Sequence, residues 1–293
     1  MKILFIGSVK FSKKCLAHLF DLKLEVVGVI TRDYTGLNTD HANLQPLAES
    51  KGVPVLVTQN VNTSASLEWI KKCGPDVVFC LGWSNLLKAE ILKAAPLGVI
   101  GFHPAALPAN RGRHPLIWAL ALGLSETATT FFLMDEGADS GDIISQFRLK
   151  INPEDDAGTL YRKMTQNALK QLTDFIPELI KGTLNPQKQN HHLANVWRKR
   201  SQCDGLIDWR MSAKTIANLV RALARPYPGA EFLRNNEGIK IWRAEAVMEV
   251  DKNLEPGKVI GGTKLAPIVK CGEGAVKIIE CEPIISFNNG EYL

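Results

Sequence analysis

Two kinds of segment alternate along residues 1–182. Short apolar runs rich in β-branched residues predict buried strands, and longer stretches with apolar residues every three or four positions predict helices. The predicted strands span residues 2–6, 25–30, 54–56, 76–81, 98–102, 127–134 and 143–149. The predicted helices span residues 12–22, 44–51, 65–73, 88–94, 115–122 and 156–181. This alternation favours an α/β fold with a Rossmann-like, mostly parallel sheet and flanking helices.

The pattern changes after Gly182. Residues 184–200 form a polar stretch with a proline, which is typical of a linker. A helix is predicted at 212–224, followed by strand-like runs at 229–233, 239–244, 258–260, 267–270 and 276–280. That spacing favours a β-rich domain, either an OB-like barrel or a sandwich. We therefore expect a first domain over 1–183, a linker over 184–200 and a C-terminal β-rich domain over 201–293.

Composition narrows the class of protein. Of the 293 residues, 45% are hydrophobic and 22% are charged, which is typical of a soluble globular protein. A net charge of +5 allows an anionic partner such as a nucleotide but does not require nucleic acid. The six cysteines show no CxxC pair, so we expect free thiols and no metal site. The chain shows neither a signal-like start nor a run long enough to span a membrane, so we expect a cytoplasmic protein without a membrane partner.

Two loops after predicted strands carry groups suited to ligand binding, which in an open parallel sheet occurs at the carboxyl ends of the strands. Residues 82–87 (GWSNLL) mix apolar and hydrogen-bonding groups, although a turn and helix cap made by Ser84 or Asn85 is the alternative. His103 ends the next apolar run and precedes a proline-rich, basic loop. Neither a GxGxxG fingerprint after Gly7 nor a GxxxxGK[ST] loop is present, which argues against dinucleotide-binding and P-loop classes.

His103 and Asp139 are the candidate proton-transfer pair. A positioned histidine acts as a general base or proton shuttle and contributes about 10²–10⁴ in rate. A carboxylate beside it stabilises the charged imidazole and fixes its tautomer. Asp135, Glu136 and Asp142 are rival carboxylates in the same acidic loop, and we expect Asp142 only to be solvated.

Two blocks of motifs resemble the N10-formyltetrahydrofolate-dependent formyltransferases, which include methionyl-tRNA, glycinamide ribonucleotide and sugar N-formyltransferases. The first block reads His-Pro, Leu-Pro, Arg-Gly and Pro over residues 103–115, then MDEGADSGD over 134–142. The second reads DGLIDW over 204–209, LVRA over 219–222 and PYPGA over 226–230. The second block is similar to the second domain of the tRNA and sugar enzymes. The resemblance therefore covers nearly the whole chain.

The resemblance implies a catalytic Asn-x-His pair and an Asp. The histidine matches His103 and the aspartate matches Asp139, but Gly101 stands where the family has asparagine. The family's amide helps to hold the formyl oxygen, and loss of one such donor costs about 10²–10³ in rate. The candidate replacements are the side chains of Ser84, Asn85 and Asn110, and backbone N–H groups near Gly101.

The resemblance also implies N10-formyltetrahydrofolate as co-substrate, without a metal. The residues expected to bind the folate lie in the loops after three strands: Gly82, Trp83, Ser84, Leu86, Leu87, Arg111, Glu136, Gly137 and Ala138.

The amine acceptor is inferred from residues 31–41. The tRNA enzymes have a basic insertion here, whereas this chain has one Arg and two Asp, which make a poor phosphate-binding surface. Asn38-Thr39-Asp40 looks like the segment of sugar N-formyltransferases. The implied acceptor is a UDP- or dTDP-linked 4-amino-4,6-dideoxy sugar, as in pseudaminic-acid-type pathways. The residues expected to bind this nucleotide sugar are Arg113, His114, Arg221, Arg225 and Tyr227, of which the last three have a structural role as the alternative.

Other functions remain open at this point. They are a methionyl-tRNA formyltransferase, a non-catalytic folate- or nucleotide-binding module, and a related hydrolase in which water replaces the amine. The basic run at residues 197–200 suggests nucleic acid, but a solvated linker or a gate for the nucleotide sugar are the alternatives. We expect no nucleic-acid partner and leave a homodimer open.

Overall fold

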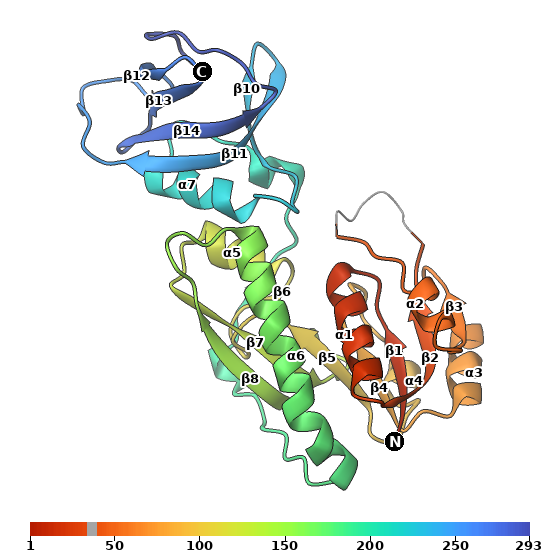
Figure 1. Cartoon of the computed structure of the whole chain (residues 1–293). Coiled ribbons are helices and arrows are strands. Elements are labelled where there is room, and N and C mark those ends of the chain that lie inside the picture. The colour runs from red at the N-terminus through yellow and green to blue at the C-terminus, as the bar shows by residue number, and fades with distance from the viewer. Residues whose placement is uncertain (34–39) are drawn as a thin grey trace. The chain divides into compact units, whose positions relative to one another are not determined.

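The computed structural model describes residues 1–33 and 40–293 (Figure 1). Asn38 and Thr39, which support the expected sugar-type segment, lie outside the described residues. The chain forms two compact units. Unit 1 comprises Met1–Pro115, Thr127–Leu149 and Arg162–Trp197, and unit 2 comprises Leu116–Glu126, Lys150–Tyr161 and Arg198–Leu293.

The central sheet has seven strands in the order β3-β2-β1-β4-β5-β7-β8. The strands are β1 (Lys2–Ile6), β2 (Glu25–Thr31), β3 (Val55–Val57), β4 (Val77–Cys80), β5 (Val99–His103), β7 (Glu126–Leu133) and β8 (Ile143–Lys150). The first five strands in this order, β3, β2, β1, β4 and β5, pair in parallel with their neighbours, and β7 runs antiparallel to β5. The predicted mostly parallel α/β sheet is therefore confirmed.

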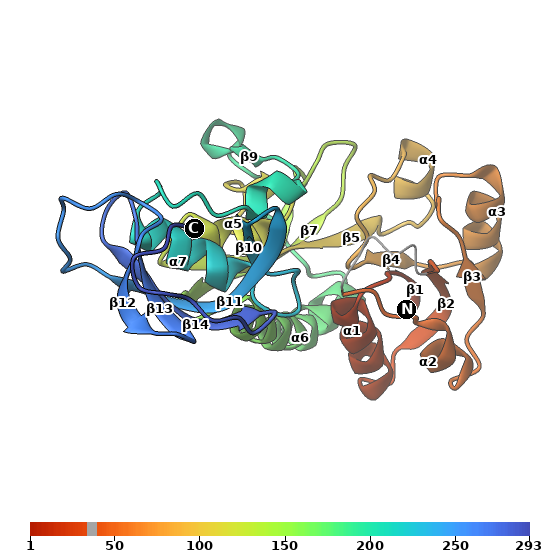
Figure 2. The same ribbon diagram turned by 90° about the horizontal axis from the view of Figure 1, so that it is seen from above.

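Helices cover both faces of this sheet, as the uninterrupted apolar strands predicted (Figure 2). The helices of unit 1 are α1 (Lys10–Asp21), α2 (Gln45–Glu49), α3 (Ser64–Cys73), α4 (Ala89–Leu92) and most of α6 (Ala157–Lys181). Helix α5 (Pro115–Ala121) belongs almost entirely to unit 2. On one face, Phe175 of α6 packs against Phe79 of β4 and Phe131 of β7. On the other face, Ile70 of α3 and Ile91 of α4 join the core that includes Val78.

The switch in strand order between β1 and β4 creates the crevice in which ligands of such sheets bind. Gly7 follows β1 at this point, and a Cβ there would lie 2.5 Å from the carbonyl oxygen of Leu81 and 2.6 Å from Cβ of Ser12. Ser12 is fully buried; its hydroxyl donates to the Leu81 carbonyl and accepts from the backbone of Ser8 and Val9. Only glycine allows α1 to approach the two strand ends this closely.

Unit 2 contains helix α7 (Ala213–Ala222) and an antiparallel five-stranded sheet in the order β10-β11-β14-β13-β12. These strands are β10 (Ala230–Arg234), β11 (Glu237–Val247), β12 (Val259–Thr263), β13 (Ala266–Lys270) and β14 (Ala275–Glu282). The Ser212 hydroxyl caps α7 by accepting from the Thr215 N–H. All five predicted strands are present, with β11 and β14 longer than expected, and the β-rich character is confirmed.

The pattern did not predict four short elements. They are β6 (Arg111–Gly112), β9 (Val196–Trp197) and the 3₁₀ turns η1 (His191–Leu193) and η2 (Gln202–Gly205). Strand β6 pairs in parallel with β9 across more than eighty residues, and no local periodicity encodes such a pairing. Residues 184–197, expected as part of a linker, belong to unit 1. In residues 1–33 and 40–293, no helix combines the length and apolarity needed to span a membrane.

We expect Gly7→Ala to lower the free energy of unfolding by about 1–3 kcal/mol or more, because the added methyl meets a backbone oxygen that has no room to move. Gly261→Ala in β12 is the matched control, since a Cβ there meets nothing within 4 Å. Urea unfolding of both variants checks this prediction. Equal unfolding midpoints for the two variants would contradict it.

Candidate active site

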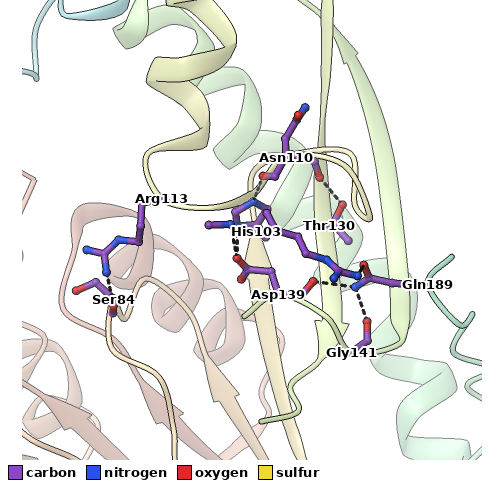
Figure 3. Close-up of polar contacts among 11 residues, drawn as sticks. Ser84, His103, Asn110, Arg113, Thr130, Asp139, Gly141 and Gln189 are labelled. Carbon is purple, nitrogen blue, oxygen red and sulfur yellow. Dashed lines mark hydrogen bonds and ion pairs between the residues drawn. The ribbon is translucent and has the colours of Figure 1, made fainter. Parts of the chain in front are cut away.

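His103 is the last residue of β5 and is only 4% exposed. Its Nε2 lies 2.7 Å from the carbonyl oxygen of Asn110, and its Nδ1 lies 3.5 Å from Oδ2 of Asp139 (Figure 3). A carbonyl oxygen only accepts hydrogen bonds, so Nε2 carries a proton and donates it. Nδ1 is therefore the nitrogen left to gain and lose a proton, and it faces a carboxylate.

Asp139 lies on the loop between β7 and β8. Its backbone has φ +55°, a left-handed conformation that costs non-glycine residues about 1–3 kcal/mol and persists only where the surroundings enforce it. Oδ2 accepts a 2.9 Å hydrogen bond from the Gly112 N–H. The oxygen that faces His103 is thus held in place by the loop that follows β5.

That loop is in turn held by β9. The Asn110 N–H donates to Oδ1 of Asn195 at 2.7 Å, and the Arg111 N–H donates to the Asn195 carbonyl at 3.0 Å. The Arg113 N–H donates to the Trp197 carbonyl at 3.0 Å. Both the acceptor for His103 and the donor for Asp139 therefore depend on backbone pairing with residues 195–197.

Gly101 occupies the same face of β5 as His103, because side chains alternate along a strand. A Cβ at Gly101 would lie 2.8 Å from Cγ of Met134 and 3.0 Å from Cζ of Phe132. The space beside His103 on this face is filled by a thioether and a phenyl ring. Position 101 therefore offers no side-chain hydrogen-bond donor and no room for one without repacking.

The structure does not bring the predicted replacements for the missing amide to His103. Asn110 contributes its backbone carbonyl, while its side-chain amide points away from the imidazole (Figure 3). Ser84 and Asn85 are exposed on the loop after β4, and Ser84 uses its carbonyl to accept from Arg113 at 2.9 Å. Backbone N–H groups remain the candidate donors for a developing oxyanion.

The predicted folate-binding residues fall on three loops. In the loop after β4, Leu87 is buried and Leu86 is 59% exposed. Gly82 has φ +76°, and a Cβ there would collide with the side chains of Ser12 in α1 and of Val9, which precedes α1. On the third loop, Glu136, Gly137 and Ala138 are exposed, with the loop braced by Asp135.

Trp83 and Arg32 together carry three buried hydrogen-bond donors that lack acceptors among the described residues. The guanidinium of Arg32 lies over its ring at 3.7 Å from the centroid. In the described part of the chain, Nε1 of Trp83 and Nε and Nη2 of Arg32 are buried without hydrogen-bond partners. Burial also lowers the pKa of Arg32. Sequence reasoning missed Arg32, which follows β2 as a single cation without a motif.

The predicted nucleotide-sugar residues divide between the two units. In unit 1, Arg113 is exposed and joins the loops after β4 and β5, and His114 has φ +54°. In unit 2, Arg221 donates to three carbonyls of residues 152–155 at 3.3 Å. Arg225 pairs with Glu280 and Glu282 and stacks on Trp242.

The Tyr227 N–H donates to the Ala224 carbonyl within the PYPG turn. These contacts give Arg221 and Arg225 structural partners, as the alternative interpretation expected.

Two residues that contact the site were not predicted. Gln189 and Asn195 lie in the polar stretch 184–200, which has no hydrophobic period and no motif that would distinguish them from linker residues. Among residues 1–33 and 40–293, no cluster of three or more His, Cys, Asp or Glu side chains could hold a metal ion.

Comparison with known proteins identifies the family to which the chain belongs. Residues 1–176 match the formyl transferase family model, and residues 199–285 match the model of the formyl transferase C-terminal domain. The chain is 34% identical over 287 residues to methionyl-tRNA formyltransferase of Caldanaerobacter subterraneus subsp. tengcongensis, covering 96% of this chain and 92% of that protein.

Solved structures share the fold. An N-formyltransferase from Helicobacter canadensis, in complex with folinic acid and dTDP-3-aminofucose, aligns with TM-score 0.73 and 18% identity over 95% of this chain and 98% of that chain. HypX from Aquifex aeolicus, in complex with tetrahydrofolic acid, aligns with TM-score 0.69 and 19% identity. The alignment covers 96% of this chain but only 44% of HypX.

The chain belongs to the formyl transferase family. It is a folate-dependent N-formyltransferase. In its structure, Nδ1 of His103 faces Oδ2 of Asp139.

We expect Gly101→Ala to destabilise the protein by about 1–3 kcal/mol, because its methyl crowds Met134 and Phe132. Met134→Ala in the same chain should relieve part of this cost, giving a coupling energy of about 0.5–3 kcal/mol in a double-mutant cycle. Thermal or urea unfolding of the four proteins measures the coupling. Strictly additive effects would show that Met134 does not fill the space at position 101.

Proposed function

We propose that this enzyme transfers the formyl group of N10-formyltetrahydrofolate to the amine of a UDP- or dTDP-linked 4-amino-4,6-dideoxy sugar. The observation that carries the proposal is the arrangement of His103, in which Nε2 is committed to the Asn110 carbonyl and Nδ1 faces Asp139. Within this proposal, residues 1–183 form the catalytic domain and residues 201–293 the C-terminal domain.

The protein's part in the reaction is proton transfer. The acceptor nitrogen forms a bond to the formyl carbon, the bond from that carbon to N10 breaks, the amine loses one proton and N10 gains one. Nδ1 of His103 accepts the proton, and the negative charge of Asp139 stabilises the imidazolium that results. The same nitrogen then returns the proton to the departing amine, so the enzyme ends in its starting state.

The residues around the loop after β4 suit a folate. The folate supplies the formyl group, and its pterin and glutamate portions are rich in hydrogen-bond acceptors. Buried donors without partners are costly, and Trp83 and Arg32 carry three such atoms beside this loop. Acceptors of the bound folate would satisfy donors of this kind, with Arg111 serving instead to organise the site.

The charge of the C-terminal domain favours a small acceptor over tRNA. Residues 201–293 contain twelve Lys and Arg and twelve Asp and Glu, so this domain has no net positive charge. Several of its cations are neutralised by internal partners: Arg210 by Asp208, Arg225 by Glu280, and Arg234 by Glu291. Affinity for a nucleic-acid backbone requires Lys and Arg that remain available to many phosphates, whereas a nucleotide diphosphate needs only a few.

Methionyl-tRNA formylation is the second candidate, and the 34% identity over 96% of the chain favours it. Its basic surface would have to come from elsewhere than residues 31–41 or the C-terminal domain. The run Trp197–Arg200 is partly engaged, because Arg198 pairs with Asp204 and Arg200 donates to the Asp204 carbonyl. The side chains of Arg198 and Arg200 also lie over Trp118.

We expect the purified protein to formylate a UDP- or dTDP-linked 4-amino-4,6-dideoxy sugar in the presence of N10-formyltetrahydrofolate, and to leave initiator methionyl-tRNA unmodified. Mass spectrometry of both acceptors and absorbance of released tetrahydrofolate measure this. Formylated methionyl-tRNA, with a rate that falls steeply with salt, would establish the second candidate instead. Folate binding without product from any acceptor would reject both.

We expect His103→Ala to lower kcat by about 10²–10⁴, because it removes the proton acceptor. Asp139→Asn should also lower kcat, since a neutral amide does not stabilise the imidazolium. His192→Ala and Asp142→Asn are the controls, because they remove the same groups from an exposed turn and from the far end of the acidic loop. Turnover like that of the wild type in a folded His103→Ala or Asp139→Asn protein would remove that residue from the mechanism.

A further inference from the structure

Gln189 is buried beside the catalytic loop, with 5% of its surface exposed. Its Nε2 donates to the carbonyl oxygens of Asp139 at 3.0 Å and Gly141 at 2.6 Å. Its Oε1 accepts from Nη2 of Arg111 at 2.6 Å. Carbonyls only accept and a guanidinium only donates, so these partners dictate which way the amide faces.

Arg111 links Gln189 to the other half of the site. It is 9% exposed, and in the described residues its side-chain partners are the neutral amide of Gln189 and Nδ1 of His191 at 3.0 Å. Its neighbours in the chain are Asn110, whose carbonyl binds His103, and Gly112, whose N–H binds Asp139. Arg111 therefore links two parts of the site. Its backbone neighbours bind His103 and Asp139, and its side chain binds Gln189, whose amide holds the loop of Asp139.

The segment that carries Gln189 is anchored on both sides. Two residues before it, Gln187 exchanges backbone hydrogen bonds with Ile143 at 2.8 Å in both directions, which fixes it to the start of β8. After it, β9 pairs with β6. A side chain between two such anchors has little freedom to drift, which suits it to hold another residue.

We propose that Gln189, oriented by Arg111, is a positioning residue that holds Asp139 opposite Nδ1 of His103. Asp139 has a left-handed backbone that does not persist without outside support. Gln189 supplies two side-chain hydrogen bonds to the backbone of that loop, one of them to the carbonyl of Asp139 itself. The inference rests on the proposed catalytic role of His103 and Asp139.

Gln189→Glu removes the two donated hydrogen bonds but keeps the contact with Arg111. The carboxylate still accepts from buried Arg111, but it has no N–H to donate, and its charge repels the carbonyls of Asp139 and Gly141. We expect the melting temperature to fall, KM of the folded protein for folate and acceptor to be unchanged, and its kcat to fall by about 10–100-fold, the scale of a 1 Å misplacement. Gln187→Glu, the same change at an exposed position of the same segment, should leave all three unchanged.

A double-mutant cycle tests whether Gln189 acts through Asp139. In an Asp139→Asn background, Gln189→Glu should cause no further loss of kcat, because the carboxylate that it positions is already gone. A folded Gln189→Glu protein with full kcat would overturn the proposal. Losses that multiply in the double variant would overturn it as well.

A spectroscopic arm needs no substrate and so stands apart from the proposed function. The ¹⁵N resonances of His103 in Gln189→Glu should shift from their wild-type positions toward those of Asp139→Asn. Unchanged His103 resonances would reject the positioning role even if the acceptor is correct. Product formation by wild type tests the proposed function separately. If Gln189→Glu fails to fold, Gln189→Asn, which keeps the amide but shortens its reach, replaces it in every arm with the same expected results.

Discussion

The hydrogen bond from Nε2 of His103 to the carbonyl of Asn110 is the constraint on which the site depends. It fixes a proton on Nε2, while Nδ1 faces the carboxylate of Asp139. The carbonyl can take this position because Asn110 has a left-handed backbone and donates its own N–H to Asn195. The tautomer of a histidine at the end of a central strand is therefore set by a residue far along the chain, outside the sheet.

The face of β5 beside His103 distinguishes this enzyme from the pattern that its motifs resemble. Gly101 has no side chain, and Met134 and Phe132 fill the vacated space. These three residues are packed together, so a larger side chain at position 101 would require Met134 and Phe132 to repack. In the proposed reaction, the formyl oxygen would therefore take its hydrogen bonds from backbone donors or from the bound molecules.

The arginines near His103 and those of the C-terminal domain are both engaged by partners within the protein, but the partners differ. The loops around His103 and Asp139 carry few cations, and these bind neighbouring groups of the protein. Arg111 donates to the side chain of Gln189, and Arg113 donates to the carbonyl of Ser84. In the C-terminal domain, arginines such as Arg225 and Arg234 are paired with acids. The net positive charge of the chain therefore lies in residues 1–200, because residues 201–293 carry equal numbers of acidic and basic side chains.

The sequence by itself determined the α/β architecture, the bounds of most elements and the pairing of His103 with Asp139. The architecture follows from the hydrophobic period, and the pairing of His103 with Asp139 follows from the family motifs that they resemble, although the two residues are 36 positions apart. Tertiary structure decided which nitrogen of His103 carries the proton, what fills the space at Gly101, and that Gln189 and Asn195 form hydrogen bonds with the loops that carry Asp139 and Asn110. These depend on hydrogen bonds and packing between residues tens of positions apart, such as Asn110 with Asn195. The local sequence around a polar residue does not indicate which distant carbonyl its side chain will bind.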